Sequence, residues 1–268
     1  MNEAALCARI SAMIEGFVYG LRRADPDAGF GCSEPFDSGF WSILSILEGN
    51  AQGIPLEQAL QRRLSIVLGS DQLPNETRAT LERFGETGDL YGGVDVDASA
   101  ALTRTLGVAL CETSQERRVE RAVQVVGVTH FSPLAAQTAI ALVDIQANVL
   151  VGSSAATAIE SAREHVEHPL VLDVLHTDDA RVAGGLTAEH TSVDALRWVV
   201  WSALQPGRPQ ETLQKVVDGS GKNPVAMALS GAVSAACYDQ HEIPPMVDLR
   251  SKEIAEEIAY WRGQLRTA

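Results

Sequence analysis

Aromatic residues are scarce in this sequence, at 5% of its 268 positions, so its core must be built mainly from Ala, Leu, Val and Ile. Such side chains suit closely packed helices better than a β-sandwich. Basic residues are also few, because 21 Lys and Arg stand against 35 Asp and Glu, which gives a net charge of −14. A nucleic-acid-binding face needs the opposite sign, so we expect no nucleic-acid partner. An acidic surface could suit a basic protein partner or simply keep the chain in solution.

Cysteines are few and widely separated, at Cys7, Cys32, Cys111 and Cys237, with no CxxC motif. This spacing argues against a zinc ribbon or a small disulfide scaffold, so we expect reduced, buried thiols. The first residues lack the basic start and apolar run of a signal peptide, and no stretch approaches the ~20 apolar residues of a membrane span. We therefore expect a cytoplasmic protein with no membrane partner.

Apolar residues recur at steps of three and four over most of the chain, which is typical of amphipathic helices. The segments with this period are residues 6–21, 40–47, 56–68, about 98 onwards, about 115 onwards, 133 onwards, 153–168, 192–204, 209–217, 224–238 and 254–265. No linker, repeat or β-hairpin signal divides the chain. We therefore predict that residues 1–268 form one all-α domain.

The connections between these helices are predicted from Pro, Gly and Asp. Residues 25–39 are rich in all three, which predicts a loop. Pro169 is expected to end the helix that begins near Ser153. The apolar run from Leu170 to Leu175 fits either a helix or a strand.

Common catalytic motifs are missing or incomplete. No GxSxG elbow occurs, and GSSAA at 152–156 is typical of a helix start. GSGKNP at 219–224 is similar to a phosphate-binding loop, but Val216 stands at the place of the first Gly and Asn223 at that of the Ser or Thr. The segment therefore fails as a nucleoside-triphosphate site.

Two groups of polar residues have a spacing compatible with metal binding. His165 and His168 stand three residues apart beside glutamates, and Asp178 and Asp179 are adjacent. A solvated helix end explains the histidines equally well, and a helix cap explains the two aspartates.

Two loops are candidates for a ligand site. THFSP at 129–133 places His130 beside a helix start, and DGSGKNP at 218–224 places Lys222 before the helix that begins at Pro224. Backbone N–H groups at a helix N-terminus, together with a Lys ammonium, favour an anion. The alternative is an ordinary Gly-rich turn between helices.

The order of several segments resembles the ADP-ribosylglycohydrolase family. These segments are the opening helix at 10–21, VTHFSPLAAQTAIALVDI at 128–145, GGLTAEHTSVDALRWVVWSAL at 184–204 and GSGKNPVAMALSGAVSAACYDQHEIPP at 219–245. The resemblance implies a single orthogonal multi-helix domain that holds two Mg²⁺ ions with carboxylates. It also implies cleavage of ADP-ribose from protein side chains or related compounds.

The metal-binding motifs of that family are largely unmatched. Its last motif carries two metal-binding aspartates, whose places are taken here by Gly221 and Asn223, with Lys222 between them. Its early motif aligns with residues 37–40, where Asp37 is the one carboxylate, and its middle motif falls near Asp97 without a match. Since a dication needs several oxygen ligands, we expect no metal, no cofactor and no two-metal hydrolysis.

We expect a ligand to contact residues in the aligned loops. The expected ligand-binding residues are Asp37, Asp97, His130, Gly219, Ser220, Gly221, Lys222 and Asn223. By resemblance, the ligand would be ADP-ribose, an ADP-ribosylated protein or an ADP-ribosyltransferase, the last as in an immunity protein. Lys222 could neutralise the phosphates as a point charge.

Two other functions stay open. The first is a metal-independent N- or O-glycosidic hydrolase or lyase acting on an ADP-ribose-like or nucleoside substrate. In that enzyme Asp37, Asp97, Asp95 or Glu34 would act as general acid or base, and Lys222 would stabilise charge. The second is a purely structural or oligomeric role, which predicts a wide apolar surface patch.

Overall fold

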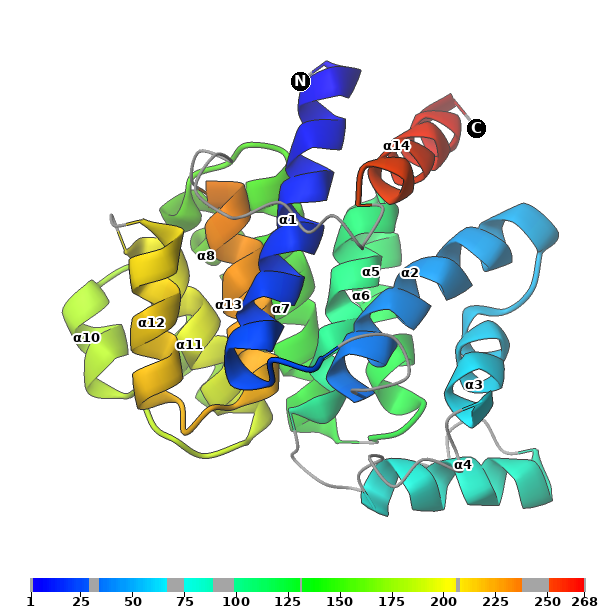
Figure 1. Ribbon diagram of the computed structural model, residues 1–268, viewed down its shortest axis with the longest axis horizontal. Coiled ribbons are helices and arrows are strands. Elements are labelled where there is room, and N and C mark those ends of the chain that lie inside the picture. Colours follow the sequence, from blue (N-terminus) through cyan, green and yellow to red (C-terminus); the bar gives the residue numbers. More distant parts are fainter. Residues whose placement is uncertain are drawn as a thin grey trace.

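The regular structure is helical throughout the part of the chain that the computed structural model describes, which is residues 2–28, 34–66, 75–88, 99–130, 132–205, 208–237 and 251–267 (Figure 1). The elements are α1 (Glu3–Ala24), α2 (Glu34–Gln52), α3 (Leu56–Ile66), α4 (Asn75–Thr87), the 3₁₀ helix η1 (Ala100–Arg104), α5 (Thr105–Cys111), α6 (Gln115–Gly127), α7 (Pro133–Leu150), α8 (Ala155–Arg163), α9 (Pro169–Val174), α10 (Asp179–Gly184), α11 (Ser192–Leu204), α12 (Pro209–Gly219), α13 (Pro224–Cys237) and α14 (Ser251–Thr267). The predicted all-α fold class is confirmed.

The helix α13 lies in the centre of the fold and packs directly on α1. Its residues from Val225 to Ala236 are buried, and many are Ala, Ser or Gly, so neighbouring backbones can approach closely. A Cβ atom added to Gly16 of α1 would lie 2.6 Å from Ala235 Cβ and closer still to the carbonyl oxygen of Gly231. The two helices therefore meet backbone to backbone, which only glycine permits at these positions.

Among the described residues, α1 is the one helix whose length and apolar composition would suffice to cross a membrane, and half of its most apolar window is buried inside the protein. Its contact with α13 accounts for that apolar character, because Ile10, Met13, Ile14 and Phe17 are fully buried.

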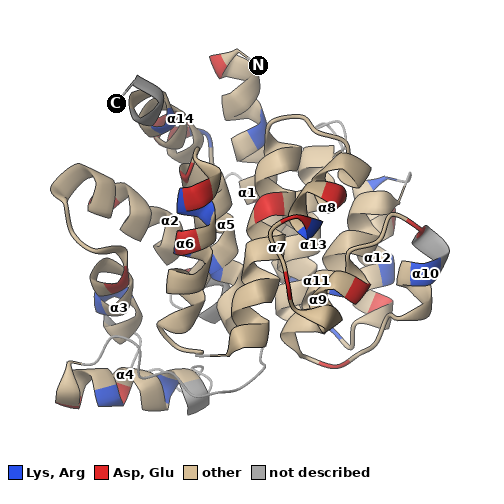
Figure 2. Ribbon diagram, turned by 180° about the vertical axis from the view of Figure 1, so that it is seen from behind, with Lys and Arg blue, Asp and Glu red and all other residues tan. Residues whose placement is uncertain are grey.

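The remaining helices pack around α13 and α7. In Figure 1, α10, α11 and α12 lie on one side of this centre, α2, α3 and α4 lie on the other, and α14 lies beside α1 at the top. The charged side chains belong mostly to the outer helices, and Figure 2 shows acidic and basic positions alternating along α4. The short helix η1 contacts α2, α6 and α13, so it lies where these three meet.

Two predicted boundaries are wrong, both at prolines. The loop predicted over residues 25–39 ends early, because α2 begins at Glu34, with Pro35 in its first turn, where a missing N–H costs little. The helix that was expected to end at Pro169 ends at Arg163, and Pro169 begins α9 instead. His168 caps α9 through its Nδ1, which accepts from the N–H of Leu170 at 3.3 Å. Residues 170–174 are therefore helical.

Two glycine substitutions, one inside the contact between α1 and α13 and one at an open position of α4, should change the stability in opposite directions. Gly16→Ala should lower the free energy of unfolding by ~1–3 kcal/mol, because the added methyl overlaps the α13 backbone. Gly85→Ala, at an exposed position of α4 with nothing within 4 Å, should raise it by ~0.5–1 kcal/mol, because alanine favours a helix. Urea unfolding followed by circular dichroism measures both. Equal stability of the Gly16→Ala variant and the unmodified chain would contradict the packing.

Candidate functional site

A fully buried arginine, Arg104, connects segments that are far apart in the sequence. It ends η1, and its side chain donates hydrogen bonds from Nε to Ser38 Oγ at 3.3 Å, and from Nη1 to the Val125 carbonyl at 2.9 Å and Thr129 Oγ1 at 2.7 Å. These bonds satisfy Nε and Nη1, which reduces the cost of burying the guanidinium. Arg104 therefore fixes the first turns of α2 against the loop that follows α6.

The hydrogen-bond chain continues from Arg104 through Thr129 to His130. Thr129 Oγ1 accepts from Arg104 and lies 2.8 Å from His130 Nδ1. The direction of this second hydrogen bond depends on the tautomer of His130, because a hydroxyl donates one hydrogen bond and accepts two. Burial, and secondly the charge of Arg104, lower the pKa of His130 to about 4. His130 is therefore a neutral imidazole near pH 7.

His130 also lines a small apolar cavity of about 120 Å³, together with Val123, Gly127, Pro133 and Ala136. Pockets for small organic ligands have volumes of ~300–1,000 Å³, so this cavity alone is too small for a nucleotide-like ligand. Within the described part of the chain, His130 is therefore a buried residue beside a small cavity, hydrogen-bonded to Thr129.

The structure brings one of the two predicted aspartate segments to His130. Asp37 is 2% exposed and lies in α2 next to Ser38, which binds Arg104. The Asp37 segment and the His130 loop are thus joined through one guanidinium. Asp97, the other predicted aspartate, lies outside the described residues.

The loop from Gly219 to Asn223 forms a separate polar group at the N-terminus of α13. Asn223 caps that helix, because its Oδ1 accepts from the N–H groups of Val225 at 3.0 Å and Ala226 at 3.2 Å. Two of the N–H groups that the anion-site hypothesis relied on are therefore already satisfied. The side chain of Lys222 is exposed, and its φ of 59° lies in the left-handed region.

This loop packs against the segment that precedes α11. A Cβ atom on Gly219 would lie 2.9 Å from Trp198 Cζ2, and one on Gly221, which has a φ of 64°, would lie 3.3 Å from Ala188 Cβ. Trp198 Nε1 donates to the Thr187 carbonyl at 2.9 Å and so holds that segment in place. The hydrogen bonds of Ser220 and Asn223 stay within the loop, α12 and the first turns of α13, and none reaches His130.

Two polar atoms of this loop are buried without a hydrogen-bond partner among the described residues, namely Ser220 Oγ and Asn223 Nδ2. Ser220 is fully buried and Asn223 is 1% exposed. An unpaired buried donor costs ~1–3 kcal/mol, so such atoms are uncommon in folded proteins and are expected where a ligand or water completes the site. Ser220 Oγ and Asn223 Nδ2 thus each have an unused hydrogen-bonding capacity that water or a ligand could fill.

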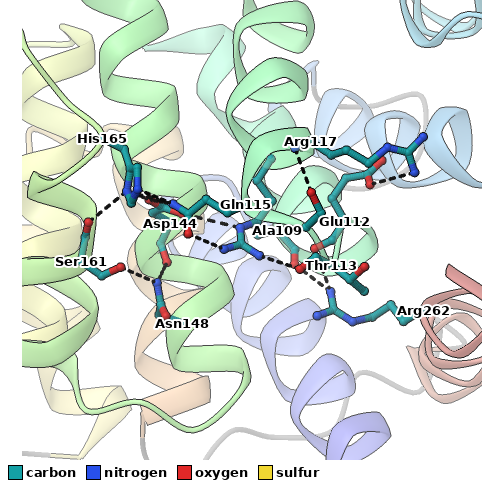
Figure 3. Close-up of polar contacts among 12 residues, drawn as sticks. Ala109, Glu112, Thr113, Gln115, Arg117, Asp144, Asn148, Ser161, His165 and Arg262 are labelled. Carbon is teal, nitrogen blue, oxygen red and sulfur yellow. Dashed lines mark hydrogen bonds and ion pairs between the residues drawn. The ribbon is translucent and has the colours of Figure 1, made fainter. Parts of the chain in front are cut away.

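The histidines with metal-compatible spacing point to different partners. Figure 3 shows His165 against α7, where His165 Nδ1 lies 2.8 Å from Asp144 Oδ2 and Gln115 Nε2 donates to the same oxygen at 3.0 Å. Burial raises the pKa of Asp144, and its interactions with Arg118 and His165 partly offset this effect. His168, by contrast, caps α9. His165 and His168 therefore contact different residues and do not face a common site.

The second metal-compatible pair also has a local role. Asp178 Oδ1 accepts from the N–H of Arg181 at 3.4 Å, as a residue ahead of a helix does. The side chain of Asp179 lies outside the described residues. Across the described residues, no group of three or more His, Cys, Asp and Glu side chains is arranged to hold a metal ion.

The chain is similar to known proteins in sequence and in structure. A family model described as ADP-ribosylglycohydrolase matches residues 40–266. A solved structure described as "ADP-ribosylglycohydrolase-related protein complex" is similar, with a TM-score of 0.76 over 96% of this chain and 98% of that chain, at 17% sequence identity. At this identity the likeness shows the fold alone. No curated protein sequence matches this chain significantly.

The neutral state of His130 predicts a pH dependence of stability. Its folded pKa of about 4 lies below the unfolded value of 6.5, so the unfolded state binds more protons between these values. Stability should therefore fall as the pH decreases from ~6.5 to ~4, by up to ~3 kcal/mol. His130→Gln should remove this part of the pH dependence, as measured by urea unfolding at a series of pH values.

A matched control is His190→Gln, because the side chain of His190 is exposed. It should leave the pH dependence unchanged. Parallel pH profiles for the unmodified chain and His130→Gln would show that His130 is not held neutral in the fold.

Proposed function

Because this chain belongs to the ADP-ribosylglycohydrolase family, we propose that it binds an ADP-ribose-like ligand without metal-dependent hydrolysis. The observation that carries the proposal is the Asn223 side chain, whose Oδ1 caps α13 while its Nδ2 is buried and lacks a partner among the described residues. An N–H donor suits an oxygen acceptor and repels a cation. The position therefore favours an acceptor-rich ligand over a metal ion.

The residues at the aligned metal motifs do not fit a pair of divalent cations. Gly221, Lys222 and Asn223 supply no carboxylate, and the one side-chain oxygen among them is engaged with two N–H groups of α13. Asp37 is the remaining carboxylate of the early motif, and its neighbour Ser38 binds the Arg104 guanidinium. Magnesium ions bind through carboxylates and keep several waters, so this donor set is too small and too positively charged.

An ADP-ribose-like ligand fits the loop from Gly219 to Asn223 better. Its phosphates and hydroxyls present many acceptor oxygens, which match Asn223 Nδ2 and the Ser220 hydroxyl. The positive end of the α13 dipole and the Lys222 ammonium favour a negatively charged group at this place. An ADP-ribosylated protein presents the same group, and an ADP-ribosyltransferase is a further partner that the family resemblance suggests.

One substitution distinguishes ligand binding by Asn223 Nδ2 from a role of Asn223 in capping α13 alone. Asn223→Asp keeps the oxygen that caps α13 and replaces the Nδ2 donor with a second carboxylate oxygen, so the chain should stay folded but lose ~1–3 kcal/mol of stability, because the new buried oxygen lacks a donor. ADP-ribose binding should weaken at least about tenfold, because the carboxylate repels phosphate. Lys222→Ala should weaken it about fivefold. Isothermal titration calorimetry in EDTA measures the affinities.

The control is Lys215→Ala, because Lys215 is an exposed lysine on the neighbouring helix α12. It should leave the affinity unchanged. ADP-ribose binding that requires Mg²⁺ would contradict the proposal.

Mass spectrometry of an ADP-ribosylated protein incubated with the chain in EDTA tests the alternative, because release of ADP-ribose would identify a metal-independent hydrolase. Binding to an unmodified ADP-ribosyltransferase, with none to ADP-ribose, would replace the small-molecule ligand with a protein partner.

A further inference from the structure

A groove of about 930 Å³ runs between α1 and α14, which lie side by side at the top of Figure 1. Its α1 side is lined by Ala4, Cys7, Ala8 and Ala12, and its α14 side includes Ala255. These side chains are small; Ala4 is exposed and Cys7 and Ala8 are half-buried, so another backbone can approach this part of α1 closely, whereas Ala12 and Ala255 are already buried. The groove lies along the N-terminal half of α1, away from the end near Gly20 that meets the start of α13.

Both walls of the groove are firmly anchored. The first wall, α1, is held against α13 by the contact between Gly16 and Gly231. The second wall, α14, is held by the buried Arg262, whose Nη1 donates to the carbonyls of Leu110 at 2.7 Å and Ala109 at 3.2 Å at the end of α5 (Figure 3). A preformed surface of this kind loses little conformational entropy when it binds a partner.

The charged residues of the groove are mainly acidic. Among the described residues that line it, Glu3, Glu15 and Glu256 stand against one cation, Lys252. Glu15 is held in place by Ser251 Oγ, which donates to its carboxylate at 2.6 Å. Burial raises the pKa of the Cys7 thiol, and the charges of Glu3 and Glu256 raise it further. Both carboxylates therefore lie close to this lining residue of the groove.

We propose that the groove between α1 and α14 binds an amphipathic helix of a partner protein whose apolar stripe is flanked by basic residues. The small apolar side chains of the groove match the stripe, and the three glutamates match the basic flanks. A second copy of this chain is disfavoured as the occupant, because its net charge is −14 and the groove itself is acidic.

The dimensions of the groove suit a helix. Its lining on α1 extends from Asn2 to Glu15, which corresponds to about 20 Å of helix. Ala4, Ala8 and Ala12 recur every four residues along this length, which is the spacing of the ridges and grooves into which another helix packs. The lining on α14 covers only Lys252, Ala255 and Glu256, a little over one turn, so a partner helix of about 13 residues would lie mainly along α1.

The test uses a panel of fluorescein-labelled, helix-stabilised peptides of 14 residues with Ala, Leu or mixed apolar stripes. Each stripe is made with Lys flanks and with Glu flanks. Fluorescence anisotropy against the full chain should show saturable binding of at least one Lys-flanked peptide. Its Glu-flanked counterpart should bind at least about tenfold more weakly, and added salt should weaken the Lys-flanked complex.

Two neighbouring glutamates on α14 provide a matched pair of variants. Glu256 lines the groove and Glu257 does not, although both are exposed and their replacement by Lys changes the net charge equally. Glu256→Lys should weaken binding of the Lys-flanked peptide about tenfold, whereas Glu257→Lys should change it less than about twofold. Circular dichroism checks that both variants stay folded.

Three results would overturn the proposal. The first is that no Lys-flanked peptide of the panel binds. The second is that Glu256→Lys and Glu257→Lys weaken binding equally, which would show attraction to the overall charge alone. The third is a dimer in analytical ultracentrifugation that Ala8→Trp dissociates, which would make a second copy the occupant. None of these results bears on ADP-ribose binding, because the proposed ligand loop lies at the other end of α1.

Discussion

The backbone contact between α1 and α13 is the constraint on which the rest of this structure depends. Gly16 and Gly231 allow the two helices to touch along their main chains, and Gly20 does the same against Met227 one turn further along. This contact fixes the position of the first turn of α13 in space, and with it the position of the loop from Gly219 to Asn223. It also fixes α1 as one wall of the groove with α14. Both proposed binding places thus derive their geometry from one helix pair.

A second constraint is electrostatic and concerns Arg104. A buried guanidinium must find acceptors, and it finds them in Ser38, the Val125 carbonyl and Thr129. Its positive charge then helps to hold His130 neutral. In the ADP-ribosylglycohydrolase family, as the resemblance implies, the early motif beside Ser38 serves a metal. Here the same region is organised around a fixed cation of the chain itself, which is the physical basis for proposing a metal-free site.

Much of the helical framework could be predicted from the sequence, because periodicity and caps are local. The prediction for residues 192–204 agrees with α11, and that for 224–238 agrees with α13 as far as the described residues extend. The errors at Pro35 and Pro169 arise because proline is compatible with the start of a helix as well as with its end. Arg104 was missed because its side-chain partners Ser38 and Thr129 are 66 and 25 residues away. Only the fold brings them together.

Asn223 performs a structural role that either Asn or Asp can perform at the start of α13. The last helix needs an N-cap, and Asp and Asn fill that role about equally well through one side-chain oxygen. An exchange of Asp for Asn at this position therefore leaves α13 and its contact with α1 intact. What changes is the second side-chain atom, which becomes an N–H donor in place of a carboxylate oxygen; under the function proposed above, the preferred ligand then changes from a cation to an oxygen acceptor. Fold stability and ligand preference thus depend on different atoms of the same side chain.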